Sequence, residues 1–287
     1  MGGLAVESIT DEAVAAYHRD GAICLRGLFR DWLETLSRGV ERNMQEPSAI
    51  ATEHALDGGG GRFFEDYCSW ERIPEYRDFV LHSPAAALAG RLMGSTSVQI
   101  FHEHVLIKEP GTAKVTPWHH DMPYYCVDGQ QVISFWTALD PVPKAVCPQF
   151  VAGSHRCGKL YYPRLFDDGS NYSYAGAGYE TVPDIDAAPE DYEILSWDME
   201  PGDSLAFHFL TLHGAPGNTA PSRRRGFSTR WLGDDARYLK RPGVTSPSYP
   251  DIGLMDGQRM REDWFPVVWR AEPGSGAAET KIAEGAR

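Results

Sequence analysis

Short strand-like runs, separated by turns rich in proline and glycine, fill the chain from Ser97 onward and constrain its fold more than any other feature. The longest run, 98–108, mixes β-branched and aromatic residues with polar ones. Similar runs follow at 131–139, 192–197, 204–209 and 226–232. Many short strands of this kind predict a barrel or a jelly roll.

The first third of the chain has the apolar spacing of helices instead. Thr10 can cap a helix whose first turn carries acidic residues, and Gly21 can end it. A short strand is expected at 22–25. Three more helices are expected at about 31–44, 75–82 and 84–93.

These patterns predict one domain over residues 1–287, mainly β with N-terminal helices. Its parts are a helical N-terminal part of about 9–95, a β-barrel core of about 96–235 and a C-terminal extension of about 236–287. The end, from about residue 272, is expected to be frayed. Residues 45–64 lack periodicity and contain a run of glycines, which predicts either a lid over the functional site or a plain connection.

The composition of the chain indicates which partners and which cellular compartment to expect. No apolar run approaches the roughly 20 residues that a membrane span needs, and the N-terminus has no secretory pattern. The five cysteines are odd in number and widely spread, which favours a reducing cytoplasm over a disulfide framework. The formal net charge of −13 argues against nucleic acid as a partner and mildly against a CoA thioester, because both carry phosphates.

A His-x-Asp pair, His119 and Asp121, carries the chemistry of the strand-rich region. On a β-strand, positions i and i+2 point to the same face, so both side chains can reach one ion. His213, followed by Gly214, is the best candidate for a third ligand. Two histidines and one carboxylate, with three open positions, suit a non-haem Fe(II) oxygenase. The same ligands could also hold zinc.

Two other histidines compete for these places. His120 lies next to His119, but it should face the opposite side of the strand and is expected to form a hydrogen bond around the site. His208 lies five positions before His213, so a regular strand would turn it the other way. We expect His208 to be a core or supporting residue.

These residues together resemble one known family. His119-x-Asp121, then His213-Gly214 with Asn218, then the arginine cluster 223–225, is similar to the phytanoyl-CoA dioxygenase family of Fe(II)/2-oxoglutarate-dependent oxygenases. The opening helix and strand, the segment 135–140 and the turn 152–155 are also similar, so the resemblance covers roughly residues 9–232. The resemblance implies a double-stranded β-helix (a jelly-roll or cupin-like core), Fe(II) held by the two histidines and Asp121, and 2-oxoglutarate as co-substrate.

The same resemblance assigns a residue to the far carboxylate of 2-oxoglutarate. The family places an arginine eleven positions after the distal histidine, which here is Arg224, between Arg223 and Arg225. Arg230 shares the strand face of Arg224 and could help. The family often has a hydroxyl residue two places after the distal histidine, whereas this chain has Ala215. Trp136 resembles the tryptophan that lines the family's co-substrate pocket.

Further candidates come from position along the strands and from side-chain type. Lys108 and His104 share one face of the strand before the metal motif, so either could reach 2-oxoglutarate or substrate. Tyr124, Tyr125 and Trp231 are candidates for the substrate pocket.

The predicted function is hydroxylation, or a related C–H oxidation, of a small-molecule metabolite with O2 and release of succinate and CO2. Some relatives are halogenases, in which Gly or Ala replaces the carboxylate ligand; Asp121 therefore favours hydroxylation. Two alternatives remain: a cupin-like zinc or manganese hydrolase or isomerase, and a ligand-binding barrel without catalysis. Neither needs Arg224. The oligomeric state, monomer or homodimer, stays open.

Overall fold

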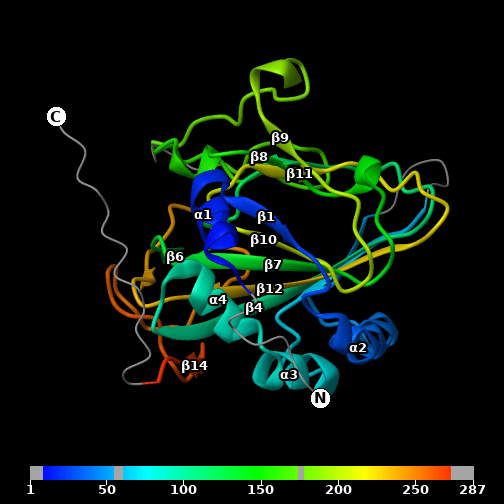
Figure 1. The fold of residues 1–287 in the computed structure, drawn as a ribbon. Coiled ribbons are helices and arrows are strands. Elements are labelled where there is room, and N and C mark those ends of the chain that lie inside the picture. The colour runs from blue at the N-terminus through cyan, green and yellow to red at the C-terminus, as the bar shows by residue number, and fades with distance from the viewer. Residues whose placement is uncertain (1–8, 55–60, 174–177, 273–287) are drawn as a thin grey trace.

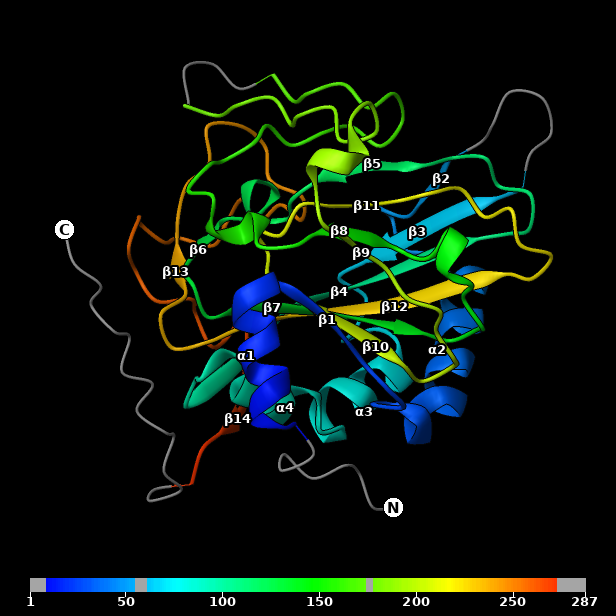
Figure 2. The same cartoon turned by 45° about the horizontal axis from the view of Figure 1, so that its top comes forward.

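The computed structural model describes residues 9–54, 61–173 and 178–272. Two antiparallel sheets lie face to face, and helices cover the outer face of the larger one (Figure 1). Figure 2 shows the smaller sheet above the larger from a second direction. This arrangement confirms the predicted class, a mainly β jelly-roll-like core with N-terminal helices.

The larger sheet has the strand order β1-β10-β7-β12-β4-β3-β2, with β14 pairing to β4. Its strands are β1 (Ala22–Leu25), β2 (Thr52–His54), β3 (Phe63–Tyr67), β4 (Ser97–Lys108), β7 (Val132–Ala138), β10 (Ser204–Phe207), β12 (Arg224–Leu232) and β14 (Val267–Arg270). The smaller sheet has the order β5-β11-β8-β9. Its strands are β5 (Thr116–His119), β8 (Gln149–Val151), β9 (Ile194–Leu195) and β11 (His213–Ala215). A separate pair joins β6 (Val127–Asp128) to β13 (Arg237–Tyr238).

The helices form where their caps and apolar stripes predict. They are α1 (Asp11–Asp20), α2 (Leu33–Gln45), α3 (Pro74–His82) and α4 (Ala85–Met93). The Thr10 side chain accepts a hydrogen bond from the Ala13 amide, and Gly21 ends α1 with a φ of 77°, a conformation that glycine adopts without strain. Short 3₁₀ turns are η2 (Arg30–Trp32), η3 (Met122–Tyr124), η4 (Lys144–Val146), η5 (Ser154–Arg156) and η6 (Pro189–Asp191).

Alternation along β4 and β12 divides the two faces of the larger sheet. Val105 and Ile107 of β4, with Phe227 and Trp231 of β12, join the core beneath the helices. The alternate residues of β4, such as His104 and Lys108, face the smaller sheet and line the cavity.

Two expectations about the outline were wrong. Within the described residues no ladder of hydrogen bonds closes the two sheets into a barrel. The part expected to be helical also contributes strands to the larger sheet. Of these, β1 is the strand expected at 22–25, whereas β2 and β3, and β14 near the C-terminus, were not predicted. The strands that β1, β3 and β14 pair with lie far along the chain, so local pattern cannot reveal this pairing.

Some expectations fall partly or wholly outside the described residues. Of the predicted lid or connection at 45–64, residues 52–54 form β2, while 55–60 are outside the described residues. The predicted frayed end lies almost entirely outside them. No helix in the described ranges is long and apolar enough to cross a bilayer. That the chain forms one domain stays a prediction.

Candidate metal centre

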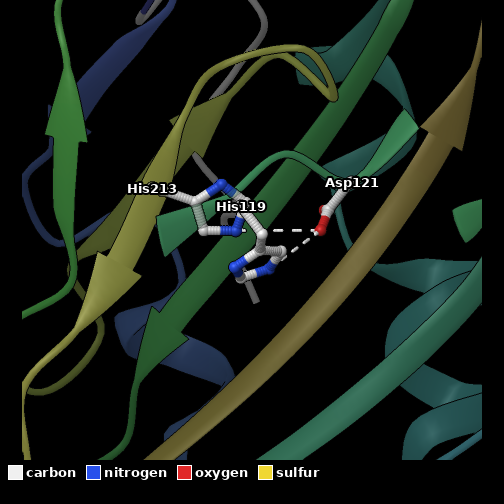
Figure 3. A group of neighbouring side chains, drawn as sticks. All are labelled: His119, Asp121 and His213. Carbon is white, nitrogen blue, oxygen red and sulfur yellow. Dashed lines mark ion pairs between the residues drawn. The ribbon is translucent and has the colours of Figure 1, made fainter. Parts of the chain in front are cut away.

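His119, Asp121 and His213 converge inside the molecule, between the two sheets (Figure 3). One ligand atom from each residue lies within 4.8 Å of the others. His119 ends β5 and His213 begins β11, and these antiparallel strands pair the two histidines directly, with ring centroids 4.2 Å apart.

Asp121 reaches the histidines by a route different from the predicted one. The strand ends at His119, and Asp121 has φ −71° and ψ −36°, a helical conformation at the start of the 3₁₀ turn η3. The chain therefore turns back after His119, and this turn brings the carboxylate to the site. Strand alternation does not.

Both histidine rings are held in one orientation by their own backbone. His119 Nδ1 lies 2.8 Å from the Pro117 carbonyl oxygen, and His213 Nδ1 lies 2.9 Å from that of Thr211. A carbonyl oxygen only accepts, so each Nδ1 carries the proton and each Nε2 keeps its lone pair. The two Nε2 atoms lie 3.6 and 3.7 Å from Asp121 Oδ1. Three ligand atoms thus face one point, with the supporting hydrogen bonds that metal-binding histidines require.

Asp121 uses its second oxygen to face a buried cation. Its Oδ2 lies 3.7 Å from Arg230 Nη2 and 3.4 Å from the Ser134 hydroxyl. Burial favours a raised carboxyl pKa, but Arg230, His119 and His213 outweigh it and hold the pKa of Asp121 well below its usual range. Burial and the neighbouring His119 lower the pKa of His213 to about 3. An ionised carboxylate and a neutral imidazole are the protonation states that bind a divalent metal.

A cavity of about 270 Å³ opens beside the triad. Besides the triad it is lined by all but one of the other predicted site residues, namely Arg224, Trp136, Lys108, His104, Tyr124 and Tyr125. The exception is Trp231, for which the prediction was wrong. Its ring is fully buried in the core under the helices, on the same side of β12 as Phe227.

Two buried basic side chains, with no carboxylate partner among the described residues, define one end of this cavity. Lys108 and Arg224 face each other across the β4–β12 pair and are 1% and 5% exposed. Among the described residues, Lys108 Nζ donates only to the carbonyl oxygens of Lys114 and Pro216 and to the Thr116 hydroxyl. Arg224 donates only to the carbonyl oxygens of Val146 and Pro216. Buried charges are normally paired, so this end is built for an anion.

The pKa values of Lys108 and Arg224 are both lowered, as expected for buried bases that lack an anionic partner. Burial, reinforced by Arg224, lowers the pKa of Lys108 to about 6. Burial likewise lowers the pKa of Arg224 to about 10. An anion bound between them would stabilise both charged forms and raise both pKa values again.

The neighbouring arginines have other partners. Arg223 pairs with Glu41 and Glu109, and Arg225 pairs with Asp140 and Glu41. Arg230 faces Asp121 at the metal centre. Arg224 is therefore the arginine of the 223–225 cluster that lines the cavity, and it pairs with no carboxylate in the described ranges.

The competing histidines lie where they were expected. His120 Nε2 accepts a hydrogen bond from the Tyr161 amide, and His208 accepts one from the Leu210 amide at Nδ1. Neither lines the cavity.

Sequence reasoning missed Glu65 and His54, which line the cavity, and Arg241, which supports it. The aromatic residues Phe63, Phe64 and Tyr67 were the available signal for β3, and hence for Glu65 on its inner face. No local pattern indicates Arg241.

An open sandwich with an internal pair of histidines and a carboxylate is the arrangement of non-haem iron oxygenases. The profile of the phytanoyl-CoA dioxygenase (PhyH) family matches residues 17–226, and the chain belongs to this family. The predicted resemblance is confirmed.

Named relatives agree with this assignment. The chain is 29% identical over 189 residues to a probable phytanoyl-CoA dioxygenase of Caenorhabditis elegans, covering 63% of this chain and 54% of that protein. It is 25% identical over 157 residues to the human peroxisomal phytanoyl-CoA dioxygenase, covering 52% and 44%. The match thus spans about half the length of these relatives.

Solved structures share the fold. The α-ketoglutarate-dependent carbocyclase SnoK from nogalamycin biosynthesis superposes with a TM-score of 0.68 at 23% identity, covering 93% of this chain and 99% of that one. The epimerase SnoN, solved with Fe3+, α-ketoglutarate and nogalamycin RO, gives 0.70 at 23% identity, covering 90% and 98%. EctD from S. alaskensis, solved with 2-oxoglutarate and 5-hydroxyectoine, gives 0.62 at 20% identity, covering 93% and 86%.

Proposed function

We propose that the protein is an Fe(II)/2-oxoglutarate-dependent oxygenase that hydroxylates, or otherwise oxidises at a C–H bond, a small-molecule metabolite. One observation carries the proposal: the metal triad shares a cavity with two buried basic side chains, Lys108 and Arg224, that have no carboxylate partner in the described part of the chain. A hydrolase or isomerase built on the same triad would have no use for that cationic end. Family membership and the structures solved with iron and α-ketoglutarate support the same choice.

In this proposal His119, His213 and Asp121 Oδ1 hold Fe(II), and Arg224 with Lys108 binds the far carboxylate of 2-oxoglutarate. The iron, 2-oxoglutarate and O2 together supply the oxidation and release succinate and CO2. The protein orients the metal ligands and the co-substrate and encloses them in the cavity. Pro117 and Thr211 hold the imidazoles, Arg230 keeps Asp121 ionised, and Trp136 lines the cavity.

His104 does not share the anion end with Lys108. It lies four residues away along β4, roughly 13 Å at the rise of a strand. We propose that His104 contributes to the substrate side of the cavity instead.

The proposal predicts slow formation of succinate from 2-oxoglutarate when anaerobically Fe(II)-loaded protein is exposed to air. Replacing Arg224 with Met removes a charge-assisted contact, so the KM for 2-oxoglutarate should rise about 10- to 100-fold. Arg223→Met is the matched control, because Arg223 pairs with Glu41 and Glu109 instead; its KM should stay within about twofold of wild type. Tight zinc or manganese binding without any 2-oxoglutarate binding would overturn the proposal.

The lowered pKa of Lys108 predicts that binding of 2-oxoglutarate depends on pH. At pH 7 its amine is mostly neutral in the empty cavity, since its pKa is about 6. A bound carboxylate stabilises the ammonium form, so binding takes up a proton above pH 6 and not below it. The Kd for 2-oxoglutarate, measured by calorimetry on Mn(II)-loaded protein, should therefore rise between pH 6 and 8, by at most about tenfold per pH unit.

Lys108→Met should flatten this rise and bind more weakly throughout. Lys159→Met should keep the wild-type slope, since Lys159 is half-exposed and pairs with Glu180. An unchanged slope in Lys108→Met would exclude Lys108 as the titrating group.

A further inference from the structure

Farther along the same strands from the cationic end, the wall that the larger sheet gives the cavity contains polar atoms without partners. Six buried side-chain nitrogen or oxygen atoms in the described residues have no hydrogen-bond partner. Five of them belong to residues that line the cavity: Glu65 Oε2, His102 Nε2, His104 Nε2, Ser228 Oγ and Arg230 Nη1. Glu65 Oε2 and His104 Nε2 face each other at 3.3 Å, so the atoms that face the cavity with no polar neighbour are His102 Nε2, Ser228 Oγ and Arg230 Nη1. Buried polar atoms in folded proteins are almost always satisfied, by protein, water or ligand. Their concentration on one wall indicates a binding surface.

Strand register separates this wall from the cationic end. Ser228, His104 and Tyr67 lie side by side across β12, β4 and β3. Glu65 lies on β3, two strands from the Arg224 strand, or roughly 10 Å across the sheet. It is nearer to Lys108, one strand across and two residues along, or roughly 8 Å between the Cα positions, and its charge raises the pKa of Lys108. An anion held by Lys108 and Arg224 leaves the β3 side of the cavity for another molecule.

Glu65 is the charged group of the β3 side. Its Oε1 lies 2.9 Å from His54 Nε2, and its Oε2 lies 3.3 Å from His104 Nε2. His54 Nδ1 in turn lies 2.6 Å from Asp167 Oδ1. Burial alone would raise the pKa of Glu65, but His104 and His54 outweigh burial and hold the pKa at about 2. The wall therefore presents an ionised carboxylate to the cavity at neutral pH.

His102 adds a second acceptor nearby. Its Nδ1 lies 3.1 Å from the Glu103 carbonyl oxygen and so carries the proton. Burial, reinforced by the charge of Arg230, lowers the pKa of His102 well below its usual value. Its Nε2 is therefore an acceptor facing the cavity. The Glu65 carboxylate and His102 Nε2 favour a ligand that donates hydrogen bonds on the β3 side of the wall. The unpartnered Arg230 Nη1, which can only donate, belongs to the arginine beside Asp121 at the metal centre.

We propose that Glu65, supported by His54 and His104, recognises a hydrogen-bond-donating group of the substrate, a hydroxyl or an ammonium group. Substrates with a carboxylate or phosphate at this position are rejected, because they would face an ionised carboxylate across a buried wall. The assignment rests on the proposed function, since it makes this cavity the place where the metabolite is oxidised.

Three probes with one carbon skeleton test the assignment: cyclohexylmethanol, cyclohexylmethylammonium and cyclohexanecarboxylate. Their Kd values are measured by calorimetry on protein loaded with Mn(II) and 2-oxoglutarate. Wild type should bind the alcohol or the ammonium at least about tenfold more tightly than the carboxylate. Glu65→Gln should weaken the ammonium about tenfold and the alcohol less, which tells the two donor groups apart. Glu65→Leu should remove the preference for both.

Glu53→Gln is the matched control, because Glu53 lies on neighbouring β2, pairs with Arg62 and does not line the cavity. It should keep the wild-type ratios, and thermal unfolding checks that the Glu65 variants fold. The recognition proposal is overturned if the carboxylate binds as tightly as the donors, if no probe binds, or if Glu65→Leu keeps the wild-type ratio. The titration of 2-oxoglutarate into Mn(II)-loaded wild type tests the oxygenase proposal separately. If 2-oxoglutarate does not bind, the oxygenase proposal is wrong, whatever the three probes show.

Discussion

Replacing Asp121 with alanine is expected to abolish succinate formation and also to destabilise the metal-free protein by about 3 kcal/mol. The first effect follows from the lost ligand, since Oδ1 faces both histidine Nε2 atoms. The second follows from Oδ2, which faces the buried Arg230 guanidinium. Without Asp121, Arg230 keeps its hydrogen bond to the Tyr125 hydroxyl but loses the carboxylate that faces its buried charge.

Two measurements separate these effects. Metal titration should show at least about a 100-fold loss of affinity, more than substitution of supporting residues causes. Urea unfolding of metal-free protein should show the loss of stability. The double variant Asp121→Ala/Arg230→Met removes the orphaned charge, so it should recover most of the stability and none of the metal binding. Wild-type metal affinity in Asp121→Ala would exclude the proposed centre.

Local pattern was sufficient for much of the fold. Thr10 caps the start of α1 and Gly21 ends it, as predicted. The alternation along 98–108 correctly places His104 and Lys108 on the cavity side of β4. The same alternation was enough to exclude Trp231 from the cavity, because it shares the helix-facing side of β12 with Phe227. That error came from weighing side-chain type above strand position.

Other features depend on contacts that no local pattern contains. The turn after His119 is a backbone choice that brings Asp121 to the histidines, and spacing alone suggested a continuous strand. Arg224 and Arg230 differ in role because of what surrounds them: backbone carbonyl oxygens for one and Asp121 for the other. The wall of Glu65 and His54 forms only when β2 and β3 add to the edge of the sheet beside β4.

Arg241 is the supporting residue farthest in sequence from the metal motif, and it holds the segment that follows Asp121. Its buried guanidinium donates from Nε to the Tyr125 carbonyl oxygen at 2.8 Å. It also donates from Nη2 to the carbonyl oxygens of Met122 at 3.0 Å and Val127 at 2.6 Å. These bonds fix the 3₁₀ turn η3, on which the position of the Asp121 carboxylate depends. Arg241 is thus a positioning residue for a ligand it does not touch.

Arg241→Met should therefore lower stability and metal affinity together. Loss of these charge-assisted bonds should cost about 3–4 kcal/mol in urea unfolding. Metal affinity, titrated well below the unfolding temperature, should fall about 10- to 100-fold, as for other residues that orient ligands. Arg270→Met, at an exposed arginine paired with Glu262, should change stability by no more than about 0.5 kcal/mol and metal affinity not at all. If Arg241→Met lost stability but bound metal like wild type, the turn would keep its shape without Arg241. The position of Asp121 would then be set by the remaining contacts of η3, such as the hydrogen bond from the Met122 amide to the Phe209 carbonyl oxygen.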